Sequence, residues 1–271
     1  MEREWMIQKK SLTAPVAYLG QKVIRLIAEM GAAAIFLFQA LVRIFHPKQV
    51  APILEQVYFI GARSTNIVIL VGLFTGMVLG LQLYHTLIQV GSQGALGSVL
   101  ALSLIRELGP VLAAIMITAR AGSSMTAEIG MQRVSEQIDA LTTMRIDPLR
   151  FLVSPRVAAA LVSFPLLTAV FDITGIVGGY ISSVLLLGLD DGTFFHGVRS
   201  GVEMSDINGG TVKSLVFAVL VSTICCFEGY FTHMRTDSAG AKGVGLSTTA
   251  AVVLSCVFIL VADYVVTSLL L

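Results

Sequence analysis

Long stretches without any charged residue constrain this chain more than any other feature of its sequence. No Asp, Glu, Lys or Arg occurs in residues 64–105, and only Asp172 interrupts residues 157–189. A helix needs about 20 apolar residues to cross the hydrocarbon core of a membrane. Only 13% of all residues are charged, about half the usual share in a soluble domain. The sequence therefore predicts an all-α integral membrane protein.

Hydropathy predicts five membrane-spanning helices, at about residues 66–90, 95–119, 157–187, 211–231 and 244–271. We expect residues 1–62 to form a cytoplasmic and interfacial N-terminal segment and residues 63–271 to form the transmembrane domain. Within the first segment, residues 18–45 are predicted to form an amphipathic helix in the inner interface. Only thirteen residues separate Glu29 from Arg43, which is short for a span. A sixth span over residues 27–45 is the alternative.

The basic residues predict the orientation of the chain. Fifteen of the eighteen Lys and Arg residues fall before the first span, between the second and third, or between the fourth and fifth. Cytoplasmic loops of membrane proteins carry such an excess. We therefore expect the N-terminus in the cytoplasm and the C-terminus on the outer side.

The chain carries no recognisable catalytic motif. It lacks a Gly-x-x-x-x-Gly-Lys-Ser/Thr loop, a His-Glu-x-x-His pair and a Gly-x-Ser-x-Gly turn. Its three cysteines lie in apolar runs without zinc-ligand spacing. We expect no catalytic residue, no metal and no cofactor in this chain. The formal net charge of +1 gives no reason to expect nucleic acid as a partner.

Charged residues inside the predicted spans are candidates for function. Arg106 lies about twelve residues from each end of the second span, where an unpaired charge costs ~2.5 kcal/mol or more. Neighbouring helix positions point about 100° apart, so Arg106 and Glu107 should have different partners. Either an ion pair between helices or the polar lining of a substrate cavity would satisfy them. Lys213 could attract an anionic headgroup or could be an ordinary interfacial lysine.

Two further acids, Asp172 and Asp263, lie inside predicted spans. A transporter coupled to protons could use them. Polar contacts between helices are the favoured interpretation.

Glycines at four-residue spacing predict close helix packing. Gly72, Gly76 and Gly80 follow this spacing in the first span, and Gly175 and Gly179 repeat it in the third. Such spacing leaves a smooth groove into which another backbone can fit. The partner could be a helix of the same chain or a second subunit.

Residues 120–156 contain the most informative polar segment. Apolar residues recur there at helical spacing, and a mostly acidic set recurs on another face: Met131, Val134, Ile138 and Leu141, against Glu128, Gln132, Glu136 and Asp139. The pattern predicts a short amphipathic helix within residues 123–147. It could dock on a cytosolic partner or lie on the membrane.

Several long motifs in order resemble the MlaE/YrbE permeases. They are residues 76–82 (GMVLGLQ), 102–110 (LSLIRELGP), 119–123 with 126–130 (ARAGS, TAEIG), and 136–141 (EQIDAL) followed by Met144 and Asp147-Pro148. Shorter matches follow at residues 213–217, 229–230, 240–245, 247–249 and 263–264. The resemblance covers about residues 66–263.

The resemblance implies the permease subunit of an ABC transporter that carries phospholipid between the inner and outer bacterial membranes and maintains outer-membrane lipid asymmetry. It implies a homodimer docked on ABC ATPase subunits (MlaF-like), which would hold ATP and magnesium. A hexamer of MCE-domain proteins (MlaD-like) would lie on the periplasmic side, and a STAS-domain protein (MlaB-like) would bind the ATPase.

The resemblance also implies roles for particular residues. A lipid cavity or gate would include Arg106, Glu107, Gly76, Gly80, Tyr84 and Lys213. Contacts that couple the chain to the ATPase would include Glu128, Arg133, Glu136, Gln137, Asp139 and Leu141. A secondary transporter driven by an ion gradient and a membrane scaffold without transport are the competing hypotheses.

Overall fold

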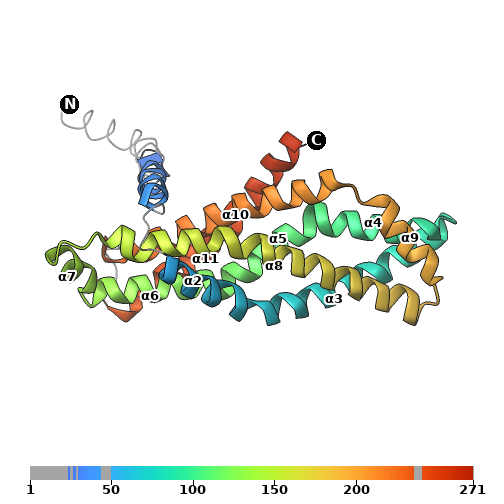
Figure 1. Cartoon of the computed structure of the whole chain (residues 1–271), viewed down its shortest axis with the longest axis horizontal. Helices are drawn as coiled ribbons and strands as arrows, with labels where there is room; N and C mark the ends of the chain where they lie inside the picture. Colours follow the sequence, from blue (N-terminus) through green and yellow to red (C-terminus); the bar gives the residue numbers. More distant parts are fainter. Residues whose placement is uncertain (1–23, 25–26, 29, 44–49, 235–239, 271) are drawn as a thin grey trace, which may run out of the picture.

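Five long apolar helical runs make up most of the described chain, as predicted. The computed structural model describes residues 24, 27–28, 30–43, 50–234 and 240–270, and every element assigned among them is helical. The runs long and apolar enough to cross a membrane are Val50–Gln89, Gln93–Val134, Leu149–Leu186, Met204–Tyr230 and Ala241–Leu270. Together they form one elongated bundle (Figure 1). The chain is therefore a multi-pass membrane protein.

Each of the first three runs combines α-helix with tighter or wider turns, here marked η. The first contains α2 (Val50–Val57), η1 (Tyr58–Ala62) and α3 (Arg63–Gln89). The second contains η2 (Gln93–Ala95), α4 (Leu96–Ser103), η3 (Leu104–Leu108), α5 (Gly109–Ile117), η4 (Thr118–Gly122) and α6 (Ser123–Val134). The third contains η5 (Leu149–Val153), α8 (Ser154–Tyr180) and η6 (Ile181–Leu186). The other elements are α7 (Gln137–Thr143), α9 (Asp191–Gly201), α10 (Met204–Tyr230), η7 (Thr232–Met234) and α11 (Ala241–Leu270).

The first three runs are longer than the spans predicted from hydropathy. The second run has 42 residues, which at 1.5 Å per residue is about 63 Å, roughly twice the hydrocarbon thickness. Its ends therefore project beyond the hydrocarbon, where charged residues are solvated and hydropathy no longer marks the helix. The predicted boundary after residue 62 falls at the junction of η1 and α3 within the first run.

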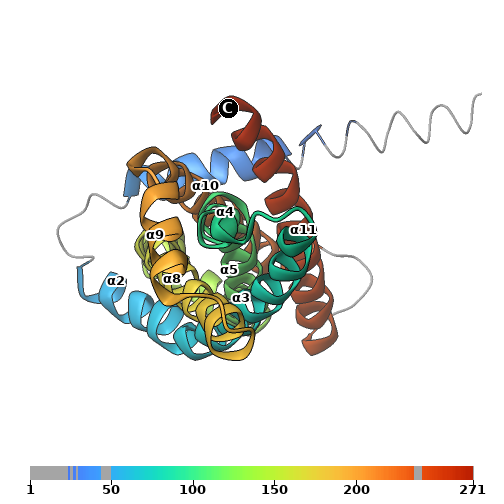
Figure 2. The same ribbon diagram turned by 90° about the vertical axis from the view of Figure 1, so that its right-hand side faces the viewer.

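The second run lies in the middle of the bundle. Figure 2, viewed along the bundle, shows α4 and α5 surrounded by α3, α8, α10 and α11. Large side chains less than 2% exposed fill the spaces around it, among them Leu100, Leu104, Ile117, Phe164, Phe171 and Phe217. This arrangement places η3, which carries Arg106 and Glu107, inside the bundle.

Helices α3 and α8 pack along a line of glycines. A Cβ atom on Gly76 would lie 1.8 Å from the carbonyl oxygen of Gly175. The two backbones are therefore in direct contact, and the structure supports packing within one chain. We call this contact the glycine seam; it consists of Gly72, Gly76 and Gly80 on α3 and Gly175, Gly178 and Gly179 on α8.

A shorter apolar helix, Met30–Arg43, crosses the long axis of the bundle (Figures 1 and 2). Phe36 on this helix packs against the rings of Phe227, Tyr230 and Phe231 on and just after α10. The hydroxyl of Ser154 donates a hydrogen bond to the carbonyl oxygen of Ala40 at 2.8 Å. The crosswise position agrees with a helix in the membrane plane. Residues 18–23, 25–26, 29 and 44–45 of the predicted interfacial helix lie outside the described residues.

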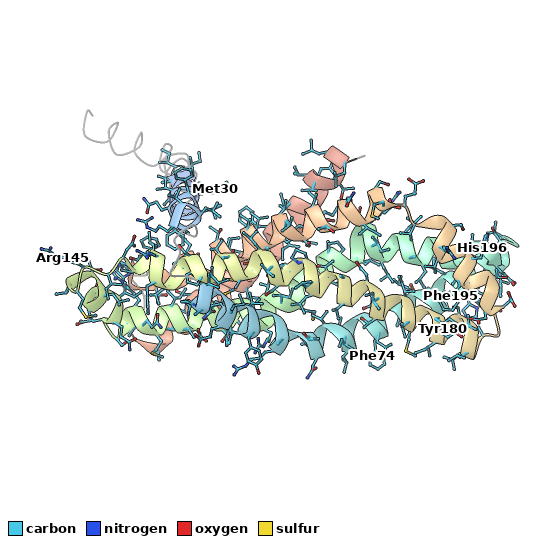
Figure 3. The ribbon with its side chains drawn as sticks, in the orientation of Figure 1. Met30, Phe74, Arg145, Tyr180, Phe195 and His196 are labelled. Atoms are coloured by element: carbon cyan, nitrogen blue, oxygen red, sulfur yellow. The ribbon has the colours of Figure 1, made fainter. Side chains whose placement is uncertain are left out.

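The two ends of the bundle are built differently. Figure 3 shows Arg145 beside α7 at one end, and Phe195 and His196 on α9 at the other. Asp190 caps α9 by accepting hydrogen bonds from the backbone N–H and the hydroxyl of Thr193 at 2.8 and 2.9 Å, and these bonds lower the pKa of Asp190. Between the ends, large apolar side chains such as Phe74 point outward (Figure 3). Such a surface suits a hydrocarbon solvent.

Candidate functional site

Pro110 creates a free backbone acceptor in the middle of the second run. Proline has no N–H, so the carbonyl oxygen of Arg106, four residues earlier, lacks its helical donor. The ammonium group of Lys213 on α10 donates to that oxygen at 2.8 Å. A lysine from another helix thus satisfies the acceptor.

Lys213 connects three helices through its ammonium group. Its side chain is 3% exposed, and its Nζ atom lies 2.5 Å from a carboxylate oxygen of Glu107 and 3.1 Å from one of Asp263 on α11. The hydroxyl of Thr267, also on α11, lies 3.3 Å from Glu107. An ammonium buried without partners is strongly unfavourable, so these carboxylates account for the position of Lys213. The alternative of an interfacial lysine that extends to water is wrong.

Arg106 does not pair with its neighbour Glu107 but with another acid, as their adjacent positions on the helix predicted. Its guanidinium lies 2.6 Å from the carboxylate of Asp206. Asp206 also accepts a hydrogen bond from the backbone N–H of Glu203 at 2.9 Å, within the capping box of α10. Because Asp206 lies in the first turn of α10, the guanidinium points toward the end of the bundle where α10 begins.

A pocket of about 480 Å³ lies beside these charges, and we call it the charged pocket. The side chains of Arg106 and Glu107 are 52% and 43% exposed, which leaves them accessible to a ligand. The pocket combines charged groups of both signs with the apolar side chains of Leu102 and Leu270. The lining residues are Leu102, Ser103, Arg106, Glu107, Ser205, Asp206, Gly209, Gly210, Lys213, Thr267 and Leu270.

The other residues predicted for a lipid cavity lie elsewhere. Gly76 and Gly80 are buried in the glycine seam. The hydroxyl of Tyr84 donates to the carbonyl oxygen of Leu187 at 3.2 Å, near the end of the bundle that carries α9. The structure thus brings together Arg106, Glu107 and Lys213 from the predicted set and separates the other three from them.

Asp172 stays outside the charged pocket. A Cβ atom on Gly109 would lie 1.8 Å from its Oδ1 atom, so α8 and the start of α5 are in close contact there. Among the described residues, this Oδ1 atom has no hydrogen-bond partner. Asp263 makes a polar contact between helices through its ion pair with Lys213 at 3.1 Å, but its Oδ1 atom likewise makes no hydrogen bond among the described residues.

The predicted coupling helix consists of two helices. α6 ends at Val134 and α7 begins at Gln137, with Glu136 between them at φ 57°. A left-handed residue turns the chain, so the apolar spacing cannot continue as one face. Met131 and Val134 are exposed, whereas Ile138 is fully buried. The prediction of a single apolar face is therefore wrong.

Some of the predicted coupling residues make contacts within the bundle, and others have exposed side chains at its end. Arg133 contacts Asp139 at 2.7 Å and His233 at 3.0 Å, and Glu128 pairs with Arg156 at 3.0 Å. These contacts hold the segment on its own bundle. The side chains of Glu136, Gln137 and Asp139 are exposed at the end of the bundle, and Leu141 is half-buried.

His233 supports this end of the bundle as a neutral imidazole. Burial, followed by the nearby charge of Arg133, lowers the pKa of His233. The neutral ring can accept a hydrogen bond from the Arg133 Nε atom, as the 3.0 Å distance indicates. Arg133 on α6 therefore links η7, through His233, to α7, through Asp139.

Comparison with known proteins gives this arrangement a family context. The family model described as "Permease MlaE" matches residues 53–269. The chain belongs to the MlaE permease family. The matched residues include α7 and every lining residue of the charged pocket except Leu270.

Relatives of the MlaE permease family match over most of the chain. "Intermembrane phospholipid transport system permease protein MlaE" of Haemophilus influenzae is 39% identical over 94% of this chain and 97% of its own length. A Rickettsia bellii protein named "Probable ABC transporter permease protein" is 39% identical over 93% of this chain and 95% of its own length. "Protein TRIGALACTOSYLDIACYLGLYCEROL 1, chloroplastic" of Arabidopsis thaliana is 35% identical over 79% of this chain and 60% of its own length.

Sequence reasoning missed Asp206 and Thr267 as pocket residues of this MlaE permease. The capping spacing of Glu203 and Asp206 could have marked the start of α10. That start would have placed Asp206 about two turns from Lys213. Thr267 carries no comparable sequence signal.

Proposed function

We propose that this chain is the permease subunit of an ABC transporter that moves phospholipid between the inner and outer membranes and maintains outer-membrane lipid asymmetry. The observation that carries the proposal is the charged pocket, which lies in the helical bundle of an MlaE-family chain. The relative from Haemophilus influenzae, whose name states phospholipid transport, supports the same substrate.

The pocket has the chemistry that a phospholipid requires. Arg106 offers a guanidinium with half of its surface accessible, and a guanidinium binds phosphate through paired hydrogen bonds. Leu102 and Leu270 provide apolar contact for an acyl chain. Three carboxylates lie beside the two cations: Asp206 pairs with Arg106, and Glu107 and Asp263 pair with Lys213. These pairs fix the positions of the cations and offset their positive charge.

We place the chain in the bacterial inner membrane as a homodimer, with the α7 end in the cytoplasm and the α9 end in the periplasm. ATP and magnesium bind to a separate ABC ATPase, which docks on the exposed side chains of Glu136, Gln137 and Asp139. A hexamer of MCE-domain proteins covers the periplasmic end, and a STAS-domain protein binds the ATPase. ATP drives transport only if it binds one state of the complex better than another.

ATP-dependent lipid movement tests the function. The complete complex in vesicles should transfer fluorescent phospholipid to acceptor vesicles when ATP is added. Arg106→Gln should slow this transfer about tenfold, the effect expected from losing a hydrogen bond to a charged group. Glu55→Gln on the exposed face of α2 is the control and should leave the rate unchanged. Transfer that continues without the ATPase would instead support a gradient-driven transporter.

Association with the ATPase tests the docking surface and the orientation together. Glu136→Lys should reduce the amount of ATPase that co-purifies with the chain, because it reverses an exposed charge without breaking a described ion pair. The combined change His196→Lys and Ser200→Lys on α9 gives the same change in formal charge at the opposite end. Normal co-purification with Glu136→Lys, or its loss with the α9 control, would contradict the proposed docking end.

A further inference from the structure

Two arginines lie near one aromatic ring where the first helical run packs against the second. The Cζ atoms of Arg63 and Arg120 lie 5.5 and 5.2 Å from the ring centroid of Phe59. Arg120 also donates to the carbonyl oxygen of Phe59 at 2.5 Å and lies 3.5 Å from the hydroxyl of Ser64. Both positive charges therefore lie within 5.5 Å of the centre of the same ring.

Neither arginine forms an ion pair with a carboxylate among the described residues. Arg63 and Glu128 are the charges that lie within electrostatic range of Arg120. Glu128 is bound by Arg156 at 3.0 Å and lies 3.4 Å from the hydroxyl of Ser124. The two guanidinium groups therefore retain hydrogen-bonding capacity for an external anion.

The positions of the two arginines in the sequence place them at the depth of the lipid headgroups. Arg63 immediately precedes the uncharged stretch of residues 64–105, and Arg120 follows the apolar stretch of residues 108–119. Both lie where a predicted span meets the cytoplasmic interface. Tyr58 is 62% exposed beside them, and the guanidinium of Arg63 lies 5.9 Å from its ring centroid. Exposed tyrosines and basic residues are typical of this interface.

We propose that Arg63 and Arg120 bind the phosphate of an anionic phospholipid from the cytoplasmic leaflet. Paired guanidinium groups suit a phosphate because each can donate two parallel hydrogen bonds. The exposed side chains of Leu54 and Tyr58 on the first run provide contact for an acyl chain. None of these residues lines the charged pocket. The lipid at this second site stabilises the junction of η1, α3 and η4 and is not the transported substrate.

Lipid-dependent thermal stability of the complex tests the site. Dioleoylphosphatidylglycerol added in detergent should raise the unfolding temperature with a saturable dose dependence. Dioleoylphosphatidylcholine and inorganic phosphate at the same phosphate concentration should not. Arg63→Gln should raise the half-saturating phosphatidylglycerol concentration about tenfold, as expected for losing a charge-assisted hydrogen bond. Arg63→Lys should raise it less.

Lys242→Gln is the matched control, because it also removes an exposed cation near the cytoplasmic end of the bundle. It should leave the half-saturating concentration unchanged. Arg120→Gln would also remove the hydrogen bond to the Phe59 carbonyl oxygen and so could destabilise the fold without any lipid. The test therefore uses Arg63→Gln. An unchanged concentration for Arg63→Gln, or equal stabilisation by inorganic phosphate, overturns the proposal. The measurement uses no ATP and no transport, so its failure would leave the proposed function standing.

Discussion

Lys213→Met is expected to lower the free energy of unfolding by about 3–5 kcal/mol, the usual cost of removing one partner from a buried ion pair. The ammonium group is the shared partner of Glu107 and Asp263 and also caps the Arg106 carbonyl. Methionine fills a similar volume but donates no hydrogen bond. The variant would therefore leave Asp263 and the Arg106 carbonyl without the Lys213 donor inside the bundle. Glu107, which is 43% exposed, would keep the Thr267 hydroxyl as a neighbour but lose its cation.

Unfolding in mixed micelles, titrated with sodium dodecyl sulfate, measures this loss. Lys213→Arg keeps the charge and should recover part of the stability. Thr267→Val removes a hydroxyl 3.3 Å from Glu107 and should cost only about 0.6 kcal/mol, the average for such bonds within membranes.

A compensated variant separates electrostatics from packing. Adding Glu107→Gln and Asp263→Asn to Lys213→Met removes both orphaned charges, so much of the stability should return. If the triple variant is as unstable as Lys213→Met alone, the loss reflects packing around the lysine stem, and the carboxylates are not what holds the three helices together.

The number of spans can be predicted from the sequence because hydrocarbon excludes unpaired charges in any tertiary arrangement. The same rule identified Arg106 and Glu107 as residues that need partners. It could not identify those partners, because the pairs that form join residues 100 and 106 positions apart. Nothing local to Arg106 indicates that Asp206 lies beside it.

Two other features depend on backbone geometry that residue spacing does not encode. The spacing of apolar residues around α6 and α7 predicted one continuous face, but Glu136 adopts φ 57°. Glutamate seldom marks such a position, so the turn had no sequence signal. Glycine spacing likewise predicts a groove without saying which helix enters it. The structure shows α8 in the groove of Gly76, where the resemblance had suggested a lipid cavity.

Gly76→Ala is expected to lower the free energy of unfolding by about 3 kcal/mol or more, the upper part of the range for overpacking. The added Cβ atom would lie 1.8 Å from the carbonyl oxygen of Gly175. A flexible side chain could move aside, but this obstacle is backbone, so α3 and α8 would have to separate. Titration with sodium dodecyl sulfate and the yield of monodisperse protein in detergent both measure the effect.

Two matched alanine substitutions show whether backbone contact is the cause. At Gly175 the new Cβ atom meets a flexible Leu104 methyl at 2.9 Å, and at Gly245 on α11 no atom lies within 4 Å. Gly175→Ala should therefore be milder than Gly76→Ala. Gly245→Ala should be neutral or stabilising by up to about 1 kcal/mol, because alanine favours helix. If Gly76→Ala is as stable as Gly245→Ala, the two backbones cannot be in contact, and Gly76 would again be free to line a cavity or a subunit interface.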